Sequence, residues 1–475
     1  MKKTSPVKLS ATLSTAIHEG WSDIWYVSSG ESDKGIGSKA RDFLWFCAED
    51  KVGSGDWRKM MNLLIRNVQL DGKTTDVLIE GNRFKAIGTG LATGAELIIE
   101  GEGKAILPTF VNMHTHASMT LMRSYADDLD LHDWLENHIW PMEANLREED
   151  IYHGARLACL EMIKSGTTCF NDMYWHYHGI ARAVEEMGLR AVLSSVFIDF
   201  KDSVRAEEQR KLTKQLERET EKYPDRIQFA LGPHAIYTVS KESLKWAIRF
   251  AEENELLIHI HVSETRKEIS DCLALYGLRP VQWLDKIGLL GPNVIAAHAV
   301  HVLPEEVGIL ARNKVKVVHC PASNMKLASG AFPFKKMQDK GVELSLGTDG
   351  CSSNNNLSMI EEMKIAALLA KVQHDDPTLL PARSVFEMAT VNGAGALGLE
   401  CGEIAEGRLA DCMLVDLSNH RLAPGYQLVD DMVYSADSSC IDTVVCDGKI
   451  LMQDGRVEGE EEIVAEARTY VKKFQ

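Results

Sequence analysis

Residues 107–116 read "LPTFVNMHTH", an apolar run that ends in two histidines one residue apart. Side chains alternate between the two faces of a β-strand, so a strand here would place His114 and His116 on the same face. Two neutral imidazoles that converge on one point supply half of the ligands that a zinc or iron site needs. The alternative interpretation is a pair of surface histidines at the end of a strand.

Seven further runs of the same kind follow along the chain, and most of them precede a stretch with helical periodicity, such as residues 240–254. The eight runs are residues 105–116, 167–173, 190–197, 226–234, 256–264, 294–301, 315–324 and 342–350. Repeated strand–helix units over about 250–300 residues predict a (β/α)8 barrel of the TIM type, with a doubly wound parallel sheet as the alternative. In such a barrel the chemistry takes place at the carboxyl ends of the strands.

Unusual side chains gather at these predicted strand ends. Eight of the 16 histidines lie there, with Glu264 three residues beyond His261 and Asp349 in the last run. The eight are His114, His116, His234, His259, His261, His298, His301 and His319. Three or four nitrogen and oxygen ligands with an open position are typical of a catalytic zinc or iron ion. Only Cys320 and Cys351 lie nearby, so we do not expect a thiolate site.

Both ends of the core chain differ from its middle. Short alternating runs, punctuated by Gly and Asp-Gly, predict strands and hairpins near the start and again near the end. We therefore expect a small β-sandwich domain, assembled from residues 61–104 and 403–458, beside a catalytic barrel at 105–402. Residues 459–475 are expected to form an amphipathic helix. Residues 1–60 show no clear periodicity and are expected to be an appendage of unknown structure.

Composition excludes several classes of partner. The chain has 475 residues, with 69 acidic and 52 basic side chains and a formal net charge of −17, which argues against binding to a nucleic-acid backbone. No apolar run approaches the length that a membrane-spanning helix needs. The ten cysteines include no C-x-x-C pair, which indicates reduced thiols and a cytoplasmic location. We expect a small-molecule partner, and a homo-oligomer is a candidate assembly.

Several of these segments together are similar to the amidohydrolase superfamily, and within it to the S-adenosylhomocysteine and 5′-methylthioadenosine deaminases. They are "HTH", "GPH", "HVSE", "AAHAVH", "CPASNMKL" and "LGTDGCSSNNN". The resemblance implies metal-dependent hydrolytic deamination of an adenosine-type nucleoside, namely S-adenosylhomocysteine, 5′-methylthioadenosine or adenosine, to the inosine-type product and ammonia. One alternative is an aminohydrolase or chlorohydrolase of another heterocycle, such as a triazine or guanine. A remote alternative is a non-catalytic binding barrel.

The same resemblance implies roles for the residues at the strand ends. The metal ligands would be His114, His116, His261 and Asp349. They would hold one divalent ion per subunit, with Zn²⁺ expected and Fe²⁺ as the alternative. Glu264 would be the catalytic proton shuttle, and His298 and Asp349 would hold the attacking water. His259 shares a strand face with His261 and is the alternative ligand.

Substrate-binding roles are also implied by the resemblance. The expected residues are Glu143, Arg205, His234, Glu264 and Asp349. Glu143 would accept hydrogen bonds from the ribose hydroxyls, and His234 would contact the purine ring. Arg205 matches a loop arginine that would bind an anionic 5′ extension, whereas Ser195 stands where a second arginine is expected. Trp134 either packs near the substrate or lies in the core.

Overall fold

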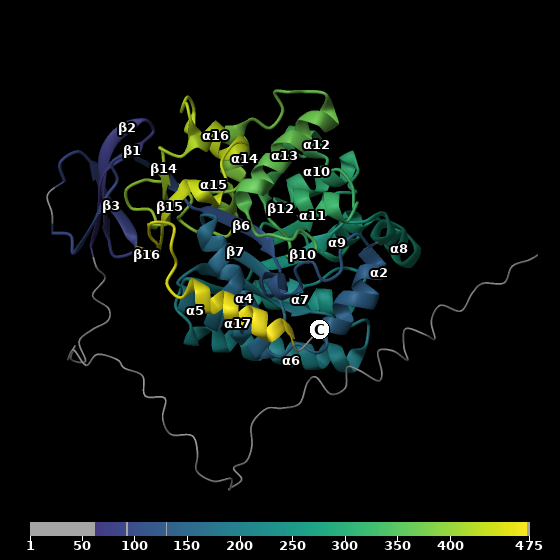
Figure 1. Ribbon diagram of the computed structural model, residues 1–475. Coiled ribbons are helices and arrows are strands. Elements are labelled where there is room, and N and C mark those ends of the chain that lie inside the picture. Colours follow the sequence, from purple (N-terminus) through teal and green to yellow (C-terminus); the bar gives the residue numbers. More distant parts are fainter. Residues whose placement is uncertain (1–61, 92–93, 130, 473–475) are drawn as a thin grey trace, which may run out of the picture.

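Eight parallel strands follow one another around a barrel in a computed structural model that describes residues 62–91, 94–129 and 131–472 (Figure 1). They are β6 (Phe110–Thr115), β7 (Thr167–Tyr174), β8 (Arg190–Phe197), β9 (Ile227–Pro233), β10 (Ile258–Val262), β11 (Val294–His298), β12 (Lys316–His319) and β13 (Glu343–Leu346). Each strand pairs in parallel with its sequence neighbour. This sequential order confirms the (β/α)8 prediction and excludes a doubly wound sheet, in which the strand order reverses.

The barrel closes where the end of β13 meets β6. The Asp349 N–H donates to the His114 carbonyl oxygen at 2.9 Å, and the Asn112 amide bonds both the hydroxyl and the N–H of Thr348. A Cβ at Gly347 would lie 2.7 Å from the His114 nitrogen, which is closer than any real contact. Glycine is therefore required for the two strand ends to approach, and their approach places His114 beside Asp349.

Helices cover the outside of the barrel between successive strands. They are α4 (Glu148–Lys164), α5 (Tyr177–Met187), α6 (Ser203–Glu219), α7 (Lys241–Glu253), α8 (Arg266–Tyr276), α9 (Pro280–Ile287), α10 (Pro304–Arg312), α11 (Pro321–Lys326), α12 (Phe334–Asp339), α13 (Met359–His374), α14 (Ala382–Met388) and α15 (Val391–Ala396). Helix α7 illustrates why they form: Ser240 caps its first turn by accepting the Ser243 N–H, and Leu244, Ala247 and Phe250 lie buried on its inner face.

A long connection after β6 contributes to the wall of the cavity at the carboxyl ends of the strands. It contains η1 (Ala117–Met122), α2 (Leu131–Trp134), the π-helical turn η2 (Leu135–Ile139) and α3 (Trp140–Glu143). Leu135 and Ile139 of the π-helical turn are buried. Such turns are uncommon and are frequent at functional sites, which agrees with the position of this segment beside the histidines.

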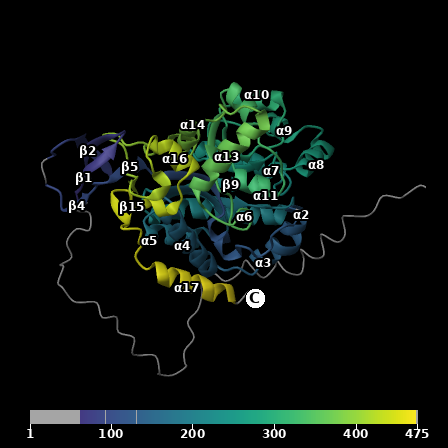
Figure 2. The ribbon, with the colours of Figure 1, turned by 45° about the horizontal axis from the view of Figure 1, so that its top comes forward.

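Strands from both ends of the described chain form a second sheet. Its members are β1 (Leu63–Leu70), β2 (Lys73–Glu80), β3 (Arg83–Gly88), β4 (Leu97–Glu100), β5 (Lys104–Pro108), β14 (Cys412–Asp416), β15 (Ile441–Cys446) and β16 (Lys449–Met452). The purple early strands and the yellow late strands lie together at one side of the barrel (Figures 1 and 2). Apolar side chains of both sets, among them Ile65, Phe84, Ile106 and Leu414, share one core.

The run at residues 105–116 was predicted as one strand, and this was wrong. The chain leaves β5 of the second sheet at Pro108 and enters β6 of the barrel at Phe110, because β5 pairs with β14 while β6 pairs with β7. β6 carries His114, and His116 follows directly after it as the N-cap residue of η1. The division of the chain into domains remains a prediction, and residues 1–60 lie outside the described residues.

Charged contacts attach the C-terminal helix to the barrel. Helix α17 (Glu460–Val471) lies along α4 (Figures 1 and 2). Arg156 bonds Glu466 at 2.6 Å, and Lys164 bonds Glu460 at 2.7 Å. The remaining short helices are η3 (Thr220–Lys222), η4 (His420–Leu422), α16 (Leu428–Tyr434) and η5 (Ser438–Cys440).

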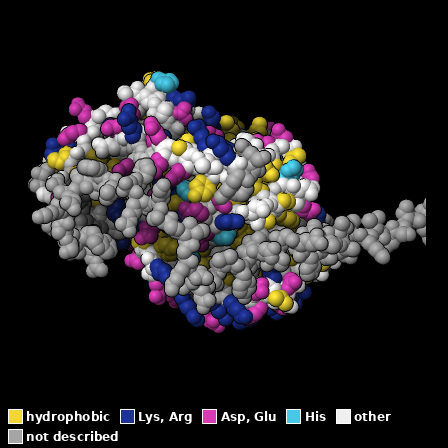
Figure 3. All heavy atoms as spheres, turned by 60° about the horizontal axis from the view of Figure 1, so that its bottom comes forward, with side chains coloured by type: hydrophobic (Ala, Val, Ile, Leu, Met, Phe, Trp, Pro, Cys, Tyr) yellow, Lys and Arg dark blue, Asp and Glu magenta, His cyan; other side chains and the backbone are white. Residues whose placement is uncertain are grey.

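Basic and acidic side chains are interspersed among the described residues on the face shown in Figure 3, where no broad basic patch is visible. Within the described part of the chain, no helix has both the length and the apolar character needed to cross a membrane.

A buried ion pair connects the two sheets, and its removal should destabilise the protein. Arg190 at the start of β8 bonds Asp411 at 3.0 Å and Asp447 at 2.9 Å. Arg190→Met would leave Asp411 buried without its cation, which typically costs about 3–5 kcal/mol. We expect a clear fall in the free energy of unfolding, measured by urea titration. Arg66→Met, at the exposed pair with Glu100, is the control and should cost less than about 1 kcal/mol. Equal effects of the two substitutions would contradict the stabilising role of the buried pair.

Candidate active site

A cavity of about 70 Å³ lies at the carboxyl ends of the barrel strands. Predicted site residues from five different strand ends and from α3 line it: His116, Glu143, His234, His261, Glu264, His298 and Asp349. His114 is completely buried directly beneath them, with its Nε2 atom 3.4 Å from Asp349 Oδ1. The structure therefore brings together every predicted site residue except Arg205.

Three imidazole rings of this cavity are held in the same way. In each, Nδ1 donates a hydrogen bond to an oxygen atom, so that Nε2 is the nitrogen left for other groups; that of His116 lies 3.2 Å from Asp349 Oδ1. The pairs are His116 with the Met173 carbonyl at 2.6 Å, His261 with the His234 carbonyl at 2.8 Å, and His298 with the Asn324 side-chain oxygen at 2.9 Å. Contacts of this kind fix the tautomer and the ring orientation of metal-binding histidines.

His259 occupies a different position from His261. Its Nε2 lies 2.8 Å from the Nδ1 atom of His114, and its Nδ1 lies 3.1 Å from the Asn171 amide nitrogen. Both ring nitrogens of His259 are thus engaged by neighbouring side chains beneath the cavity, whereas His261 keeps Nε2 free. This arrangement supports His261 as the ligand and gives His259 the role of supporting His114.

The donor atoms are close enough to share one ion. Ligand atoms of His114, His116 and Asp349 lie within 4.8 Å of one another, and so do those of His114, His261 and His298. His114 Nε2 is buried and has no hydrogen-bond partner within the described residues. An orphaned imidazole nitrogen among other imidazoles and a carboxylate fits a divalent transition metal well. Sequence reasoning assigned His298 to the water, although its Nε2 also belongs to this group.

Asp349 creates a negative field at this point. Burial raises its pKa, but the imidazoles of His114 and His116, which lie 3.4 and 3.2 Å from its Oδ1, hold the pKa well below the usual range. Burial lowers the pKa of His116, and the Asp349 carboxylate outweighs this and raises it to about 9. Burial lowers the pKa of His114 to about 4. The Asp349 carboxylate therefore stays ionised, and its negative charge favours a cation beside His114 and His116.

The backbone and two hydroxyls fix the Asp349 carboxylate. Its φ angle of +62° lies in the left-handed region, as the turn chemistry of "TDG" allows. Ser323 and Ser353 donate to Oδ2 at 2.6 and 2.9 Å, and the Gly350 N–H donates to Oδ1 at 2.8 Å. The sequence motif "CPASNMKL" contains Ser323 and Asn324, but the sequence analysis predicted no role for them. Their place directly after a barrel strand was the signal that could have indicated one.

Glu264 has the environment of a proton-transfer group. Its side chain is buried, with Oε1 3.4 Å from the Ser329 hydroxyl and Oε2 3.9 Å from His298 Nε2. Burial raises the pKa of the Glu264 carboxyl, and the nearby His298 partly opposes this effect. A carboxyl whose pKa moves towards neutrality can both accept and return a proton at physiological pH.

Comparisons with known proteins agree with this geometry. The chain matches the amidohydrolase family over residues 105–451. It belongs to the amidohydrolase family. It is 50% identical to a 5′-deoxyadenosine deaminase of Methanothermobacter thermautotrophicus, over 81% of this chain and 91% of that protein. It is 48% identical to the 5-methylthioadenosine/S-adenosylhomocysteine deaminase 1 of Archaeoglobus fulgidus, over 83% of this chain and 94% of that protein.

Solved structures show the same fold. An adenosine deaminase from Xanthomonas campestris with bound zinc superimposes with a TM-score of 0.82 at 33% identity, over 87% of this chain and 99% of that one. A triazine hydrolase from Arthobacter aurescens superimposes with a TM-score of 0.80, over 86% of this chain and 99% of that one. Its identity is only 23%, so this second likeness concerns the fold alone.

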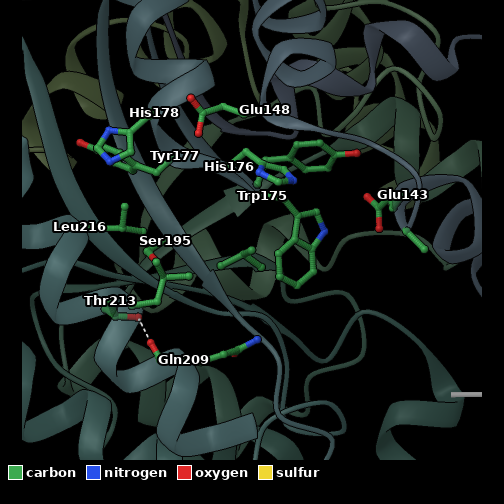
Figure 4. A pocket seen from close by; sticks show the side chains of 14 residues that line it. Glu143, Glu148, Trp175, His176, Tyr177, His178, Ser195, Gln209, Thr213 and Leu216 are labelled. Carbon is green, nitrogen blue, oxygen red and sulfur yellow. Dashed lines mark hydrogen bonds between the residues drawn. The ribbon is translucent and has the colours of Figure 1, made fainter. Parts of the chain in front are cut away.

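This amidohydrolase has a second cavity, of about 160 Å³, beside the histidines (Figure 4). Glu143, Tyr174, Trp175 and Val196 line both cavities. In Figure 4 the Trp175 indole lies between Glu143 and the residues of β8 and α6. We call this second space the side cavity. Sequence reasoning missed Trp175, although an aromatic residue directly after a barrel strand was a signal.

The two positions considered for binding an anionic tail differ in their surroundings. Ser195 lines the side cavity, whereas Arg205 is not among the residues that line either cavity. Arg205 lies in the first turn of α6, with its guanidinium 5.7 Å from the centre of the Phe200 ring. The role of Arg205 in substrate binding therefore stays a prediction.

Cover of the cavity comes partly from aromatic side chains. Trp134 is buried and lines the histidine cavity, and its Nε1 has no partner within the described residues. The sequence left open whether Trp134 lies near the substrate or in the core, and the structure places it at the boundary of the two.

Burial raises the pKa of Glu143, while Tyr174 and Trp175 oppose this effect.

Metal content should distinguish the two histidines of β10. Purified His261→Ala protein should lose most of its bound metal, because each ligand of a three- or four-ligand site is essential. His259→Ala should still bind metal, with an affinity lower by about 10–100-fold, as is usual when a supporting contact is lost. Elemental analysis with chelator competition measures both. Full metal content in His261→Ala with loss in His259→Ala would transfer the ligand role to His259.

Proposed function

We propose that this amidohydrolase deaminates an adenosine-type nucleoside, replacing the purine 6-amino group by oxygen and releasing ammonia. The substrates that we propose are 5′-deoxyadenosine, 5′-methylthioadenosine, S-adenosylhomocysteine and adenosine. One observation carries the proposal: a buried Glu264 carboxyl lines the same cavity as His116, His261 and His298, whose Nδ1 atoms are all bonded to protein oxygens. The names of the relatives at 48–50% identity support the nucleoside as substrate.

The ion would be held by His114, His116, His261 and Asp349. Imidazole nitrogens and one carboxylate form a donor set that suits Zn²⁺, with Fe²⁺ as the alternative. When bound, a divalent ion lowers the pKa of water and so supplies hydroxide near neutral pH. We propose a single ion, because the strand β9 ends in "LGPHA" and offers no lysine that could bridge two ions.

Proton transfer is the task of Glu264. Its carboxylate takes one proton from the attacking water and gives it to a ring nitrogen of the purine, which lets the oxygen add at C6. The same group passes the second proton to the departing amine, so that water and the aminopurine give the oxopurine and ammonia. The His298 ring, 3.9 Å from Glu264, would hold the water in line for attack.

The residues that line the two cavities would orient the substrate. Glu143 lines both cavities and, as an acceptor-only carboxylate, is suited to the ribose hydroxyls. His234 lies against the His261 ring, with 4.8 Å between ring centres, and would contact the purine. A non-catalytic barrel is disfavoured, because several buried ionisable groups without a task would be costly.

The side cavity would take the 5′ end of the nucleoside. The histidine cavity alone, at about 70 Å³, is much smaller than the roughly 300–1,000 Å³ of common small-molecule sites. The side cavity adjoins it at Glu143, and no lysine or arginine of the described residues lines it. Glu148 adds a carboxylate to its wall. We therefore propose a preference for neutral 5′ substituents.

A reducing, cytoplasmic location is also part of the proposal. The nine cysteines of the described residues are all free and buried. Free, buried cysteines are typical of proteins in a reducing compartment.

Glu264→Gln tests the central step. The variant keeps the shape of the side chain but cannot cycle a proton, so kcat should fall by at least about 10²-fold, the low end for general acid–base catalysis. Metal content should be unchanged. Ammonia release from 5′-methylthioadenosine, with elemental analysis of the same sample, measures both. Near-normal turnover would refute the assigned shuttle, and activity on a triazine or guanine alone would refute the nucleoside.

Arg205→Ala tests how the tail is recognised. We expect kcat/KM to be lower for S-adenosylhomocysteine than for 5′-deoxyadenosine and 5′-methylthioadenosine in the wild type. If Arg205 reaches the homocysteine carboxylate, the variant should lose about 1.5–3 kcal/mol on that substrate, the range for a hydrogen bond to a charged group. The two neutral-tailed substrates should be little affected. Equal losses on all three would mean that Arg205 supports the start of α6 and does not recognise the tail.

A further inference from the structure

Glu268 is a buried acid outside the cavity that bonds the backbone of Glu264. It lies in the first turn of α8 and is 2% exposed. Its Oε1 accepts the Ser263 N–H and its Oε2 accepts the Glu264 N–H, both at 2.8 Å. The helix begins after Thr265, whose hydroxyl accepts the Glu268 N–H. An ordinary capping box returns to the N-cap residue, whereas this carboxylate reaches the two residues before it.

The turn that Glu268 holds has an unusual conformation. Ser263 has a φ angle of +54°, in the left-handed region that costs free energy for a residue with a Cβ. The segment that follows the neighbouring strand β11 bonds the same turn, since the His301 N–H donates to the Ser263 carbonyl at 2.8 Å. Several hydrogen bonds therefore fix the backbone from which the Glu264 side chain projects. Strained backbone that is held in this way is common where the strain serves a function.

Charge makes this arrangement expensive. No ion pair found among the described residues includes Glu268. Burial raises the pKa of its carboxyl, its bonds to the backbone N–H groups oppose this and keep the ionised form, and the charge of Glu264 adds to the increase. A buried carboxylate without a cation, next to a second acid, lowers stability. Proteins that keep an unpaired buried acid of this kind usually do so at a functional site.

We propose that Glu268 is a positioning residue, which holds the Ser263–Glu264 turn and thereby aims the Glu264 carboxyl at the reacting atoms. This inference rests on the proposed function, because it assigns proton transfer to Glu264. Small errors of position are costly in such steps: a displacement of about 1 Å can lower a rate by roughly 10²-fold. A merely structural cap would instead affect stability and leave the intrinsic rate unchanged.

A double-mutant cycle tests the proposal. Glu268→Gln keeps the shape but sets an amide NH₂ group against one of the two N–H donors. In the wild-type background it should lower kcat for 5′-methylthioadenosine by roughly tenfold or more, with KM and metal content within about twofold. In the Glu264→Gln background the same substitution should change kcat by less than about twofold, since residues that act as a unit are not additive. Equal losses in both backgrounds would overturn the proposal.

Glu306→Gln is the matched control. Glu306 occupies the same position of α10, is completely buried and accepts the Leu303 N–H at 2.9 Å; unlike Glu268 it also bonds Arg279, at 2.6 Å, so the match concerns the helix position and the burial. Its turn carries no residue of the proposed machinery. We expect Glu306→Gln to lower the urea midpoint while retaining kcat. A loss of kcat in this control equal to that in Glu268→Gln would show a general effect of buried acids and overturn the inference.

Two further results keep the outcomes separate. If Glu264→Gln itself retains normal turnover, the proposed function fails whatever Glu268 does. If Glu264→Gln is impaired but Glu268→Gln adds its full loss to it, only the positioning role fails. Should Glu268→Gln not fold, Glu268→Asp replaces it, because the shorter carboxylate cannot reach both N–H groups. A folded Glu268→Asp with wild-type kcat would overturn the proposal.

Discussion

Closure of the barrel at Gly347 is the constraint on which the site depends. The last strand end passes so close to His114 that no side chain fits between them, and the Asp349 N–H then bonds the His114 carbonyl. Residues more than two hundred positions apart in sequence thereby become neighbours, and a carboxylate lies beside two imidazoles. The negative field of Asp349 and its effect on the His116 pKa follow from this approach.

Around this contact, polar groups fix one another in layers. His116, His261 and His298 donate from Nδ1 to carbonyl or amide oxygens. Asn324 and Ser323 of the single helix α11 orient His298 and Asp349 respectively. Because each ring has one nitrogen engaged, the other has a defined direction before any ligand arrives. Preorganised donors of this kind avoid reorganisation during reaction. This advantage accounts for the many polar and charged side chains that are buried at this end of the barrel.

Much of this could be predicted from the sequence, since alternation along a strand is a local property. The pairing of His114 with His116 and the position of Glu264 after His261 follow from such local patterns. Other features depend on tertiary contacts. The break between β5 and β6 arises because β14, from the far end of the chain, pairs with β5. The choice between His259 and His261 depends on which of the two rings contacts His114 Nδ1, and whether Arg205 lines a cavity depends on the tertiary position of α6.

The two consecutive serines of β8 face opposite sides of the barrel wall. Ser194 lies 3.3 Å from His259, beneath the histidines, while Ser195 lines the side cavity. Neighbouring positions of one strand thus face the histidines and the cavity proposed for the 5′ end of the substrate. Natural variation at position 195 could retune which nucleosides a lineage consumes while position 194 keeps the catalytic centre intact. With this separation, single substitutions can change the preferred substrate of the enzyme while catalytic activity is retained.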